Sequence, residues 1–311
     1  MLAIFESILP IFLLIVAGNL LRRAAVINQA AWPGLEQLGY WFLYPTLLFS
    51  TIYKADFSAL AINSMMAALL CTILAMTAFT FALYPLLIRS GMVKPSQYSS
   101  VFQTSIRWNG FIALAVAQKI FPPEGMAVVA LAMAVIIVPI NLASVYVVMR
   151  FADRQADWLS IGRNILINPL ILACLAGIIM RFVPFGLYGP IDETLDLAGR
   201  AALGMGLIAI GSGLRPEDLM RPGFALYVPV IIKLALFPLL AIAVAIGFGV
   251  TGSELGYLTL CAAVPTAMNG YLLARQLGGD APLYAAVTTL QTALSFFTMP
   301  AMLALSQLVA G

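Results

Sequence analysis

Ten long apolar runs, each bounded by charged residues, proline or glycine, dominate the pattern of hydrophobic and polar positions along this chain. They cover approximately residues 4–21, 35–52, 61–88, 98–119, 125–149, 164–182, 193–212, 223–249, 255–277 and 282–309. An α-helix needs ~20 apolar residues to cross the ~30 Å hydrocarbon core of a bilayer. Backbone groups cannot stay unpaired in lipid, and segments this long are helical rather than barrel strands. The pattern predicts an all-α membrane protein with ten transmembrane helices.

Composition agrees with one integral membrane unit. Hydrophobic residues make up 62% of the chain and charged residues only 9%, against ~25% charged in soluble domains. Too few residues lie outside the apolar runs for an added globular domain. Arg22 and Arg23 follow the first run instead of preceding it, which is the opposite of the charge order in a secretory signal. We therefore expect the first run to be an uncleaved span.

The cations in the connections predict the orientation in the membrane. Alternate connections, starting with the first, contain Arg22, Arg23, Arg89, Lys94, Arg150, Arg154, Arg163, Arg215, Arg221 and Arg275. The connections on the opposite side contain Lys54, Lys119 and Arg181. Lysine and arginine collect on the cytoplasmic side of membrane proteins. We expect a multi-pass protein of the inner (plasma) membrane with both termini on the non-cytoplasmic side.

The sequence lacks residues that several classes of function require. The chain has no histidine, which is the commonest metal ligand and general base. Cys71, Cys174 and Cys261 each lie in an apolar run without CxxC spacing, so we expect packing roles, no metal site and no resident cofactor. A scattered net charge of +3 does not indicate nucleic-acid binding. No GxSxG motif or pair of intramembrane acids is present either, so we do not expect an enzyme.

The second half of the chain repeats landmarks of the first half at a shift of about 160 positions. The matched pairs are Pro10 and Pro169, Gly18 and Gly177, Arg22 and Arg181, Asn109 and Asn269, Gly110 and Gly270, and Pro139 and Pro300. These matches predict two five-helix repeats, residues 1–155 and 160–311. Because five is odd, the second repeat must enter the membrane in the opposite sense, as in the inverted-topology repeats of many secondary transporters.

The fourth run of each half contains unusual polar and helix-breaking residues. One reads Gln103-Thr-Ser-Ile-Arg-Trp-Asn-Gly110, and its counterpart reads Pro265-Thr-Ala-Met-Asn-Gly270. Asn-Gly is a turn signal, and proline removes a backbone hydrogen bond. We predict that helices 4 and 9 are broken and cross near the bilayer centre. Irregular backbone at that depth is tolerated around a cavity, where half-helix N-termini favour anions.

Three segments resemble the auxin efflux carrier family, whose bacterial members include malate and malonate transporters. They are Ile8-Leu-Pro10-Ile-Phe-Leu-Leu, Tyr44-Pro45-Thr-Leu-Leu-Phe-Ser50 and Ala263-Val-Pro265-Thr-Ala-Met-Asn269-Gly-Tyr-Leu-Leu-Ala274. The likeness covers the whole chain, although the fourth run lacks the proline that usually follows its asparagine. The resemblance implies a scaffold bundle and a transport bundle, crossed helices four and nine, and a homodimer held by its scaffold.

The candidate substrate site lies at the two interruptions. Asn109 and Asn269 would orient a ligand, or would join helices by hydrogen bonds worth about 0.6 to 2 kcal/mol in membranes. Arg107 stays charged and has no acid nearby in the sequence, so a substrate carboxylate is an attractive partner. The alternatives are that Arg107 extends to the membrane surface or pairs with a distant acid. The remaining candidates are Gln103, Ser105, Gly110, Pro265, Thr266, Gly270 and Tyr271, for several of which helix capping is the competing explanation.

Other polar residues within apolar runs have structural interpretations. Lys233 would neutralise a carboxylate, or would bind backbone carbonyls where a neighbouring helix is interrupted. Asn19, Asn141 and Gln291 are interpreted as helix–helix contacts. The glycines between residues 199 and 213 suit close helix packing or a dimer surface.

These features together predict a secondary transporter of a small organic anion, a mono- or dicarboxylate, working by alternating access. The resemblance adds auxin-like or malate/malonate-like substrates. No apolar run has an acid at its centre, so Na⁺, H⁺ or uncoupled movement all stay open. One alternative is a bile-acid-type sodium symporter, which sodium-dependent uptake would favour. Another is a membrane sensor that binds a ligand without moving it.

Overall fold

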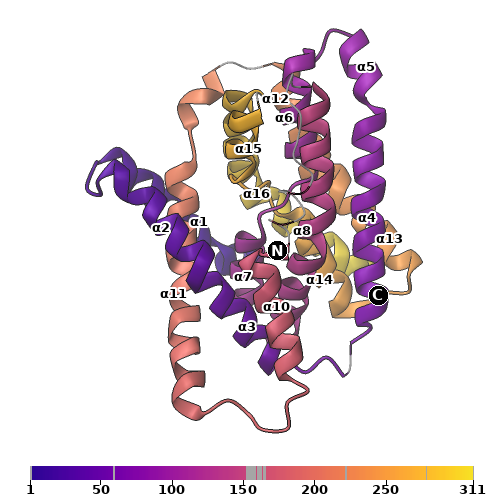
Figure 1. The fold of residues 1–311 in the computed structure, drawn as a ribbon. Helices are drawn as coiled ribbons and strands as arrows, with labels where there is room; N and C mark the ends of the chain where they lie inside the picture. Colours follow the sequence, from indigo (N-terminus) through magenta and orange to yellow (C-terminus); the bar gives the residue numbers. More distant parts are fainter. Residues whose placement is uncertain are drawn as a thin grey trace.

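A computed structural model of the chain describes residues 2–58, 60–151, 159, 163, 166–220, 223–277 and 279–310. Within these residues all regular secondary structure is helical, which confirms the all-α class (Figure 1). The elements are α1 (Leu2–Arg23), η1 (Gln29–Ala31), α2 (Trp32–Leu38), η2 (Gly39–Leu43), α3 (Tyr44–Lys54), α4 (Ile62–Ala82), α5 (Tyr84–Arg89), α6 (Pro95–Ile106), α7 (Gly110–Ile120), α8 (Pro123–Phe151), α10 (Pro169–Met180), α11 (Gly189–Gly213), η3 (Pro216–Met220), α12 (Phe224–Ile231), η4 (Ile232–Leu236), α13 (Phe237–Gly247), α14 (Gly252–Ala263), α15 (Gly270–Leu277) and α16 (Ala281–Val309).

Each predicted apolar run falls on one or more of these helices. The sixth run, predicted from residue 164, corresponds to α10, and residues 164 and 165 lie outside the described part of the chain. Arg154 and Arg221, two of the cations behind the predicted orientation, lie outside it as well. Nearly every long apolar stretch therefore forms at least one helix, as the sequence predicted.

Six helical segments in the described residues are long and apolar enough to cross a membrane. They are Ile4–Arg23, Ile62–Arg89, Pro123–Val148, Gly189–Gly213, Phe224–Gly247 and Ala281–Val309. The other four predicted runs fall on the joined elements α2, η2 and α3, on the separate pieces α6 and α7, on the short α10, and on the separate pieces α14 and α15. The chain is thus a multi-span helical protein in which some apolar runs are interrupted.

Two helical runs widen into a π-helical turn directly before a proline. The π-helical turn η2 lies directly before Tyr44-Pro45, and η4 lies directly before Phe237-Pro238. Proline has no amide hydrogen, and its ring clashes with the carbonyl four residues earlier. A wider turn relieves that clash without ending the helix. In both cases the amide of the residue before proline bonds to the carbonyl five positions back.

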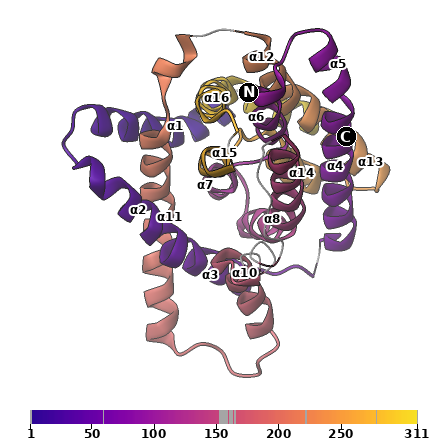
Figure 2. The ribbon, with the colours of Figure 1, turned by 45° about the horizontal axis from the view of Figure 1, so that its top comes forward.

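The helices form two groups that lie side by side in both overall views (Figures 1 and 2). In the first group α1 packs along α11, and α3 packs against both α10 and α11. The second group contains α4, α6, α8, α12, α13, α14 and α16, and the short α7 lies between the groups in contact with α1, α8, α11 and α14. The interrupted helices α6/α7 and α14/α15 lie within or beside the second group.

Glycines allow two very close helix contacts in the first group. A Cβ atom at Gly18 of α1 would collide with the carbonyl oxygen of Ile208 in α11. A Cβ atom at Gly177 of α10 would lie 3.0 Å from the carbonyl oxygen of Phe49 in α3. Small residues promote helix association in lipid because they let backbones approach and add van der Waals contact. Gly211 of α11 similarly faces the backbone of Ile15, so part of the glycine-rich stretch packs inside the molecule.

Candidate functional site

The first interruption separates α6 from α7 by three residues. α6 ends at Ile106, and Arg107 has the extended dihedral angles φ −67° and ψ 154°. Asn109 then starts α7, because its side-chain oxygen accepts a hydrogen bond of 3.2 Å from the amide of Ile112. Asparagine is among the best N-cap residues because it binds an amide that has no partner within the helix. The break therefore forms at the Asn-Gly turn without a proline.

The second interruption separates α14 from α15 by six residues and has a different local cause. α14 ends at Ala263, and Val264 is extended with φ −67° and ψ 151°. The ring of Pro265 disfavours helical angles at the residue before it, and Val264 leaves the helix here. Pro265 also lacks the amide that would bind the carbonyl of Cys261. α15 begins again at Gly270.

The two interruptions touch each other through their backbones. The amide of Asn109 donates a hydrogen bond of 2.8 Å to the carbonyl of Pro265. Both groups are buried, and neither could be satisfied within its own helix. The predicted breaks in these two runs are confirmed, and the runs meet where they are broken.

Gln291 of α16 completes the crossing by bonding both broken helices. Its side-chain nitrogen donates to the carbonyls of Thr104, at 2.9 Å, and Pro229, at 3.0 Å. Its side-chain oxygen accepts from the amide of Thr266 at 2.9 Å. One fully buried amide thus satisfies groups on α6, α12 and the second interruption. The interpretation of Gln291 as a helix–helix contact is confirmed.

Arg107 extends into the interior at this crossing and is only 6% exposed. Its Nη1 atom donates to the side-chain oxygen of Asn269 at 3.3 Å, and its Nη2 atom donates to that of Asn141 at 3.1 Å. Its Nε atom is buried without a hydrogen-bond partner, and no described carboxylate pairs with the guanidinium. Both alternatives for Arg107, reaching the membrane surface or pairing with a distant acid, are therefore wrong for the described structure. Among the described residues, the guanidinium of Arg107 is hydrogen-bonded by neutral side-chain amides.

The remaining residues predicted for the site differ in their burial and in their hydrogen-bond partners. Gln103 is fully buried one helical turn before Arg107, and neither polar atom of its side chain has a hydrogen-bond partner in the described residues. Asn269 is exposed, whereas Arg107 and Asn109 are buried. Ser105 instead bonds back to the carbonyl of Val101 in its own helix, which is a structural role. Tyr271 lies under the guanidinium of Arg215 at 5.1 Å.

The two Asn-Gly pairs use their glycines for packing. A Cβ atom at Gly110 would lie 3.0 Å from the sulfur of Met133 on α8. A Cβ atom at Gly270 would lie 2.7 Å from a ring carbon of Tyr284 on α16, whose hydroxyl donates to the carbonyl of Ala267 at 2.6 Å. These close contacts hold the starts of α7 and α15 beside the crossing. The positive ends of both helix dipoles therefore lie near Arg107.

Asn141 was missed as a site residue by the sequence analysis, although it was recognised as a polar residue in an apolar run. It lies on α8 and faces Arg107. Lys233 was recognised as ambiguous, and its ammonium group donates to the carbonyl of Ala262 at 2.8 Å near the end of α14. This confirms carbonyl binding beside an interrupted helix. Lys233 also lies 4.1 Å from the ring centroid of Phe237.

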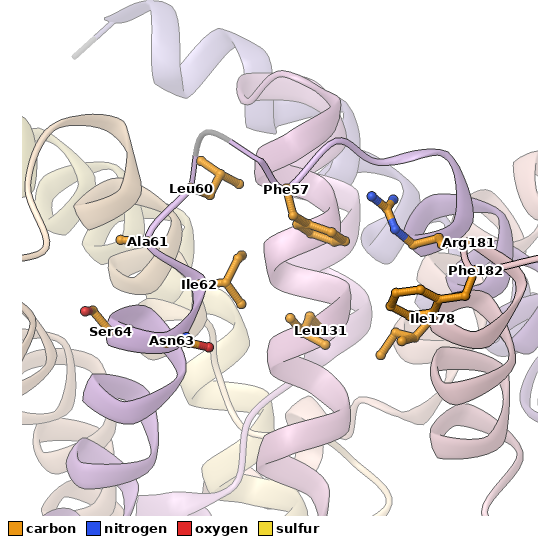
Figure 3. A pocket seen from close by; sticks show the side chains of 10 residues that line it. All are labelled: Phe57, Leu60, Ala61, Ile62, Asn63, Ser64, Leu131, Ile178, Arg181 and Phe182. Atoms are coloured by element: carbon orange, nitrogen blue, oxygen red, sulfur yellow. The ribbon is translucent and has the colours of Figure 1, made fainter.

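A separate pocket of about 600 Å³ lies away from the crossing and contains none of the predicted site residues (Figure 3). Its side chains come from the loop before α4 and the start of α4, from α8, and from the end of α10. Apolar groups such as Phe57 and Phe182 provide much of the lining. The guanidinium of Arg181 at its edge is engaged, because it donates to the carbonyls of Ile52, Tyr53 and Ala55.

Comparison with known proteins identifies the family. Residues 3–303 match the family described as "Membrane transport protein". A stretch of 146 residues is 30% identical to a Rhizobium meliloti (strain 1021) protein named "Putative malonate transporter". That match covers 47% of this chain and 46% of the relative, so it spans just under half the length of each. The chain therefore belongs to the membrane transport protein (auxin efflux carrier) family and is a multi-pass membrane protein.

Proposed function

We propose that this protein is a secondary carrier of a small organic anion, which binds at the crossing of the two interrupted helices. The proposal rests on the burial of Arg107 and on its hydrogen-bond partners. Its guanidinium is buried, retains an unused Nε donor, and has no acidic partner among the described residues. A buried charge is costly unless it is paired and hydrogen-bonded. A substrate carboxylate would supply the missing counter-charge.

The groups around Arg107 suit a carboxylate in geometry and charge. Guanidinium groups bind carboxylates through paired hydrogen bonds that are about twice as strong as neutral ones. The N-terminal ends of α7 and α15 add positive potential at the crossing. Asn269 and Gln103 would contribute neutral amide contacts that orient the ligand. A mono- or dicarboxylate is the class of substrate that uses all of these groups.

An inverted repeat is part of this proposal, and equivalent contacts in the two halves support it. Gly18 and Gly177 are 159 positions apart, and so are their contact partners Phe49 and Ile208. Gly18 meets the carbonyl of Ile208, while Gly177 meets the carbonyl of Phe49. Each glycine thus packs against the other half at the equivalent place. Such exchange is expected if residues 1–155 and 160–311 are related by a two-fold axis.

The ends of the same helices support the repeat independently. Asn19 and Arg22 donate to carbonyls at the end of α11, namely those of Gly211, Ser212 and Leu214. Arg181 donates to carbonyls at the end of α3, namely those of Ile52, Tyr53 and Ala55. The three positions in the first set are each 159 residues beyond those in the second. Arg22 and Arg181 are themselves 159 residues apart, so matching arginines cap matching helix ends.

Alternating access would follow from movement between the two helix groups. We propose that the group containing α1, α3, α10 and α11 is the scaffold and, as the resemblance implies, forms a homodimer. The group that holds the crossing would shift against it and expose Arg107 to one side of the bilayer and then the other. The cation distribution favours an orientation in the inner membrane with both termini on the non-cytoplasmic side.

Counterflow in proteoliposomes tests this function. Vesicles loaded with unlabelled malonate should take up external labelled malonate through the purified protein, and a panel of other carboxylates would define the range. We choose malonate as the first probe because of the name of the Rhizobium meliloti relative. Replacing Arg107 by Gln should reduce uptake of anions about tenfold or more, the effect of losing one charged hydrogen bond. The exposed Arg200 of α11 provides a matched Arg200→Gln control.

Two outcomes would contradict the proposal. Equal losses for anionic and neutral analogues in Arg107→Gln would remove the charge role of Arg107. Ligand binding without counterflow would identify a sensor instead of a carrier, because only a carrier exchanges label across the membrane. Uptake that requires sodium would favour the sodium-symporter alternative.

A further inference from the structure

Lys233 is the second buried cation near the crossing, and the proposed function does not use it. It is fully buried in the π-helical turn η4, between α12 and α13. Its ammonium group donates to one described oxygen, the carbonyl of Ala262, and lies over the ring of Phe237. π-helical turns inside helices are frequent at functional sites. Lysine is also costly in this position, since three donors share one carbonyl and an aromatic face.

The carbonyl of Ala262 is available because the helix ends there. In a continuous helix it would accept the amide of Thr266, but that amide bonds to Gln291. The end of a helix carries partial negative charge on such carbonyls. Carriers with discontinuous helices hold coupling cations at such ends. Lys233 therefore occupies a place that suits a coupling cation.

Among the described residues, no counter-charge lies close to Lys233. The elements packed against η4 are α6, α12, α13, α14 and α16. Their only charged residue is Glu254, in the first turn of α14 and eight residues before Ala262, or ~12 Å along the helix. Their other titratable groups are Tyr98, Tyr227, Tyr257, Cys261 and Tyr284. An ammonium in this environment lacks the pairing that buried charges need.

Lys233 is joined to the substrate site by hydrogen bonds. Pro229, one turn earlier on the same helical run, accepts from Gln291, and Gln291 also bonds to α6 and to the second interruption. Ala262, the partner of Lys233, is three residues before Pro265, whose carbonyl binds Asn109. A displacement of the end of α14 would therefore also displace the backbone at the crossing.

We propose that Lys233 carries the proton that this transporter moves together with its anionic substrate. The inference rests on the proposed function as an anion carrier. Of the two buried cations, Arg107 cannot lose its proton, whereas a buried lysine can. The amine takes a proton from water on one side when the anion is bound, and the anion supplies the missing negative charge. After the substrate leaves on the other side, the uncompensated ammonium returns that proton to water there.

The experiment measures protons moved per substrate in proteoliposomes. The membrane potential is held at zero, sodium is omitted, and labelled malonate and an internal pH dye are followed together. An inward proton gradient of one pH unit should accumulate malonate up to about tenfold for one proton per substrate, since a tenfold ratio corresponds to 1.4 kcal/mol. Lys233→Met and Lys233→Arg should both bring the proton-to-malonate ratio close to zero. One variant lacks the proton site and the other cannot release its proton.

Lys119→Met is the matched control, because Lys119 is exposed at the end of α7, and it should keep the wild-type ratio. Expressing the result per malonate moved separates coupling from a general loss of folded protein. Accumulation driven by a sodium gradient in the wild type, proton export during malonate import, or a wild-type ratio in either Lys233 variant would each overturn the inference. If neither variant folds, the wild-type measurements still test the coupling, because sodium-driven accumulation or proton export during malonate import would overturn it. A wild type that shows no counterflow with any carboxylate would instead contradict the proposed function itself.

Discussion

The backbone amide of Asn109 and the backbone carbonyl of Pro265 are joined by a hydrogen bond of 2.8 Å, although the two residues belong to opposite halves of the chain. Each group is free only because its own helix is interrupted. Arg107 lies two residues before Asn109 and reaches Asn269, four residues beyond Pro265. One backbone contact therefore brings the cation and the amides of the candidate site together.

Replacing Asn269 by Ala should reduce malonate uptake about tenfold or more. The side-chain oxygen of Asn269 accepts from Arg107, and a hydrogen bond to a charged group contributes about 1.5 to 3 kcal/mol. Asn269 is exposed, so the amount of folded protein should not change. Uptake per folded molecule, compared with an Asn63→Ala control at another exposed asparagine, checks this expectation. Wild-type uptake in Asn269→Ala would exclude Asn269 from the site.

Replacing Gln291 by Leu should destabilise the protein more than any other single change at the crossing. The change leaves the amide of Thr266 and the carbonyl of Thr104 without these partners, whereas the carbonyl of Pro229 still accepts from the amide of Ile232. Each buried unsatisfied group costs about 1 to 3 kcal/mol, so the melting temperature in detergent should fall by at least ~5 °C. Gln307, exposed on the same helix, gives the control Gln307→Leu. An unchanged melting temperature would show that these groups find other partners.

Replacing Gly18 by Ala should disrupt the packing of α1 on α11. The added methyl group would meet the backbone carbonyl of Ile208, which cannot move aside as a side chain could. Gly204→Ala on α11 is the control, since nothing lies within 4 Å of its Cβ position and alanine favours helix by about 1 kcal/mol. We expect less monodisperse protein in size-exclusion chromatography for Gly18→Ala alone. Similar behaviour of the two variants would argue against the close contact.

The two capping arginines should differ in importance. Arg181 alone donates to three carbonyls at the end of α3, whereas Arg22 shares the equivalent carbonyls of α11 with Asn19. Arg181→Gln should therefore lower the melting temperature more than Arg22→Gln. Each lost charged hydrogen bond is worth about 1.5 to 3 kcal/mol where it is shielded from water. The reverse order in a thermal denaturation series would contradict this account of the caps.

The helices and their interruptions could be predicted because they obey local rules. Apolar runs form helices in lipid, where backbone groups have no other partners. Pro265 breaks its helix by removing an amide, and Asn109 starts a new helix by capping it. The similarity of Gly18 and Gly177 could also be read from the sequence, and the structure shows each one in a close helix contact.

The partners of the polar side chains could not be predicted in the same way. The sequence pointed to Arg107 and Lys233 as cations within apolar runs. Only packing determines that Arg107 donates hydrogen bonds to Asn141 and Asn269, and that Lys233 donates to the carbonyl of Ala262. Gln291 resembles any polar residue in an apolar helix until α6, α12 and the second interruption are brought around it.

The amino-acid sequence by itself determined which segments are helical, where two of them break, and which side chains are too polar for lipid, because these depend on residues close together in the chain. The tertiary structure decided which broken ends touch and which donors are left unused. Those outcomes depend on the approach of distant helices, where a shift of one residue gives each polar atom a different partner.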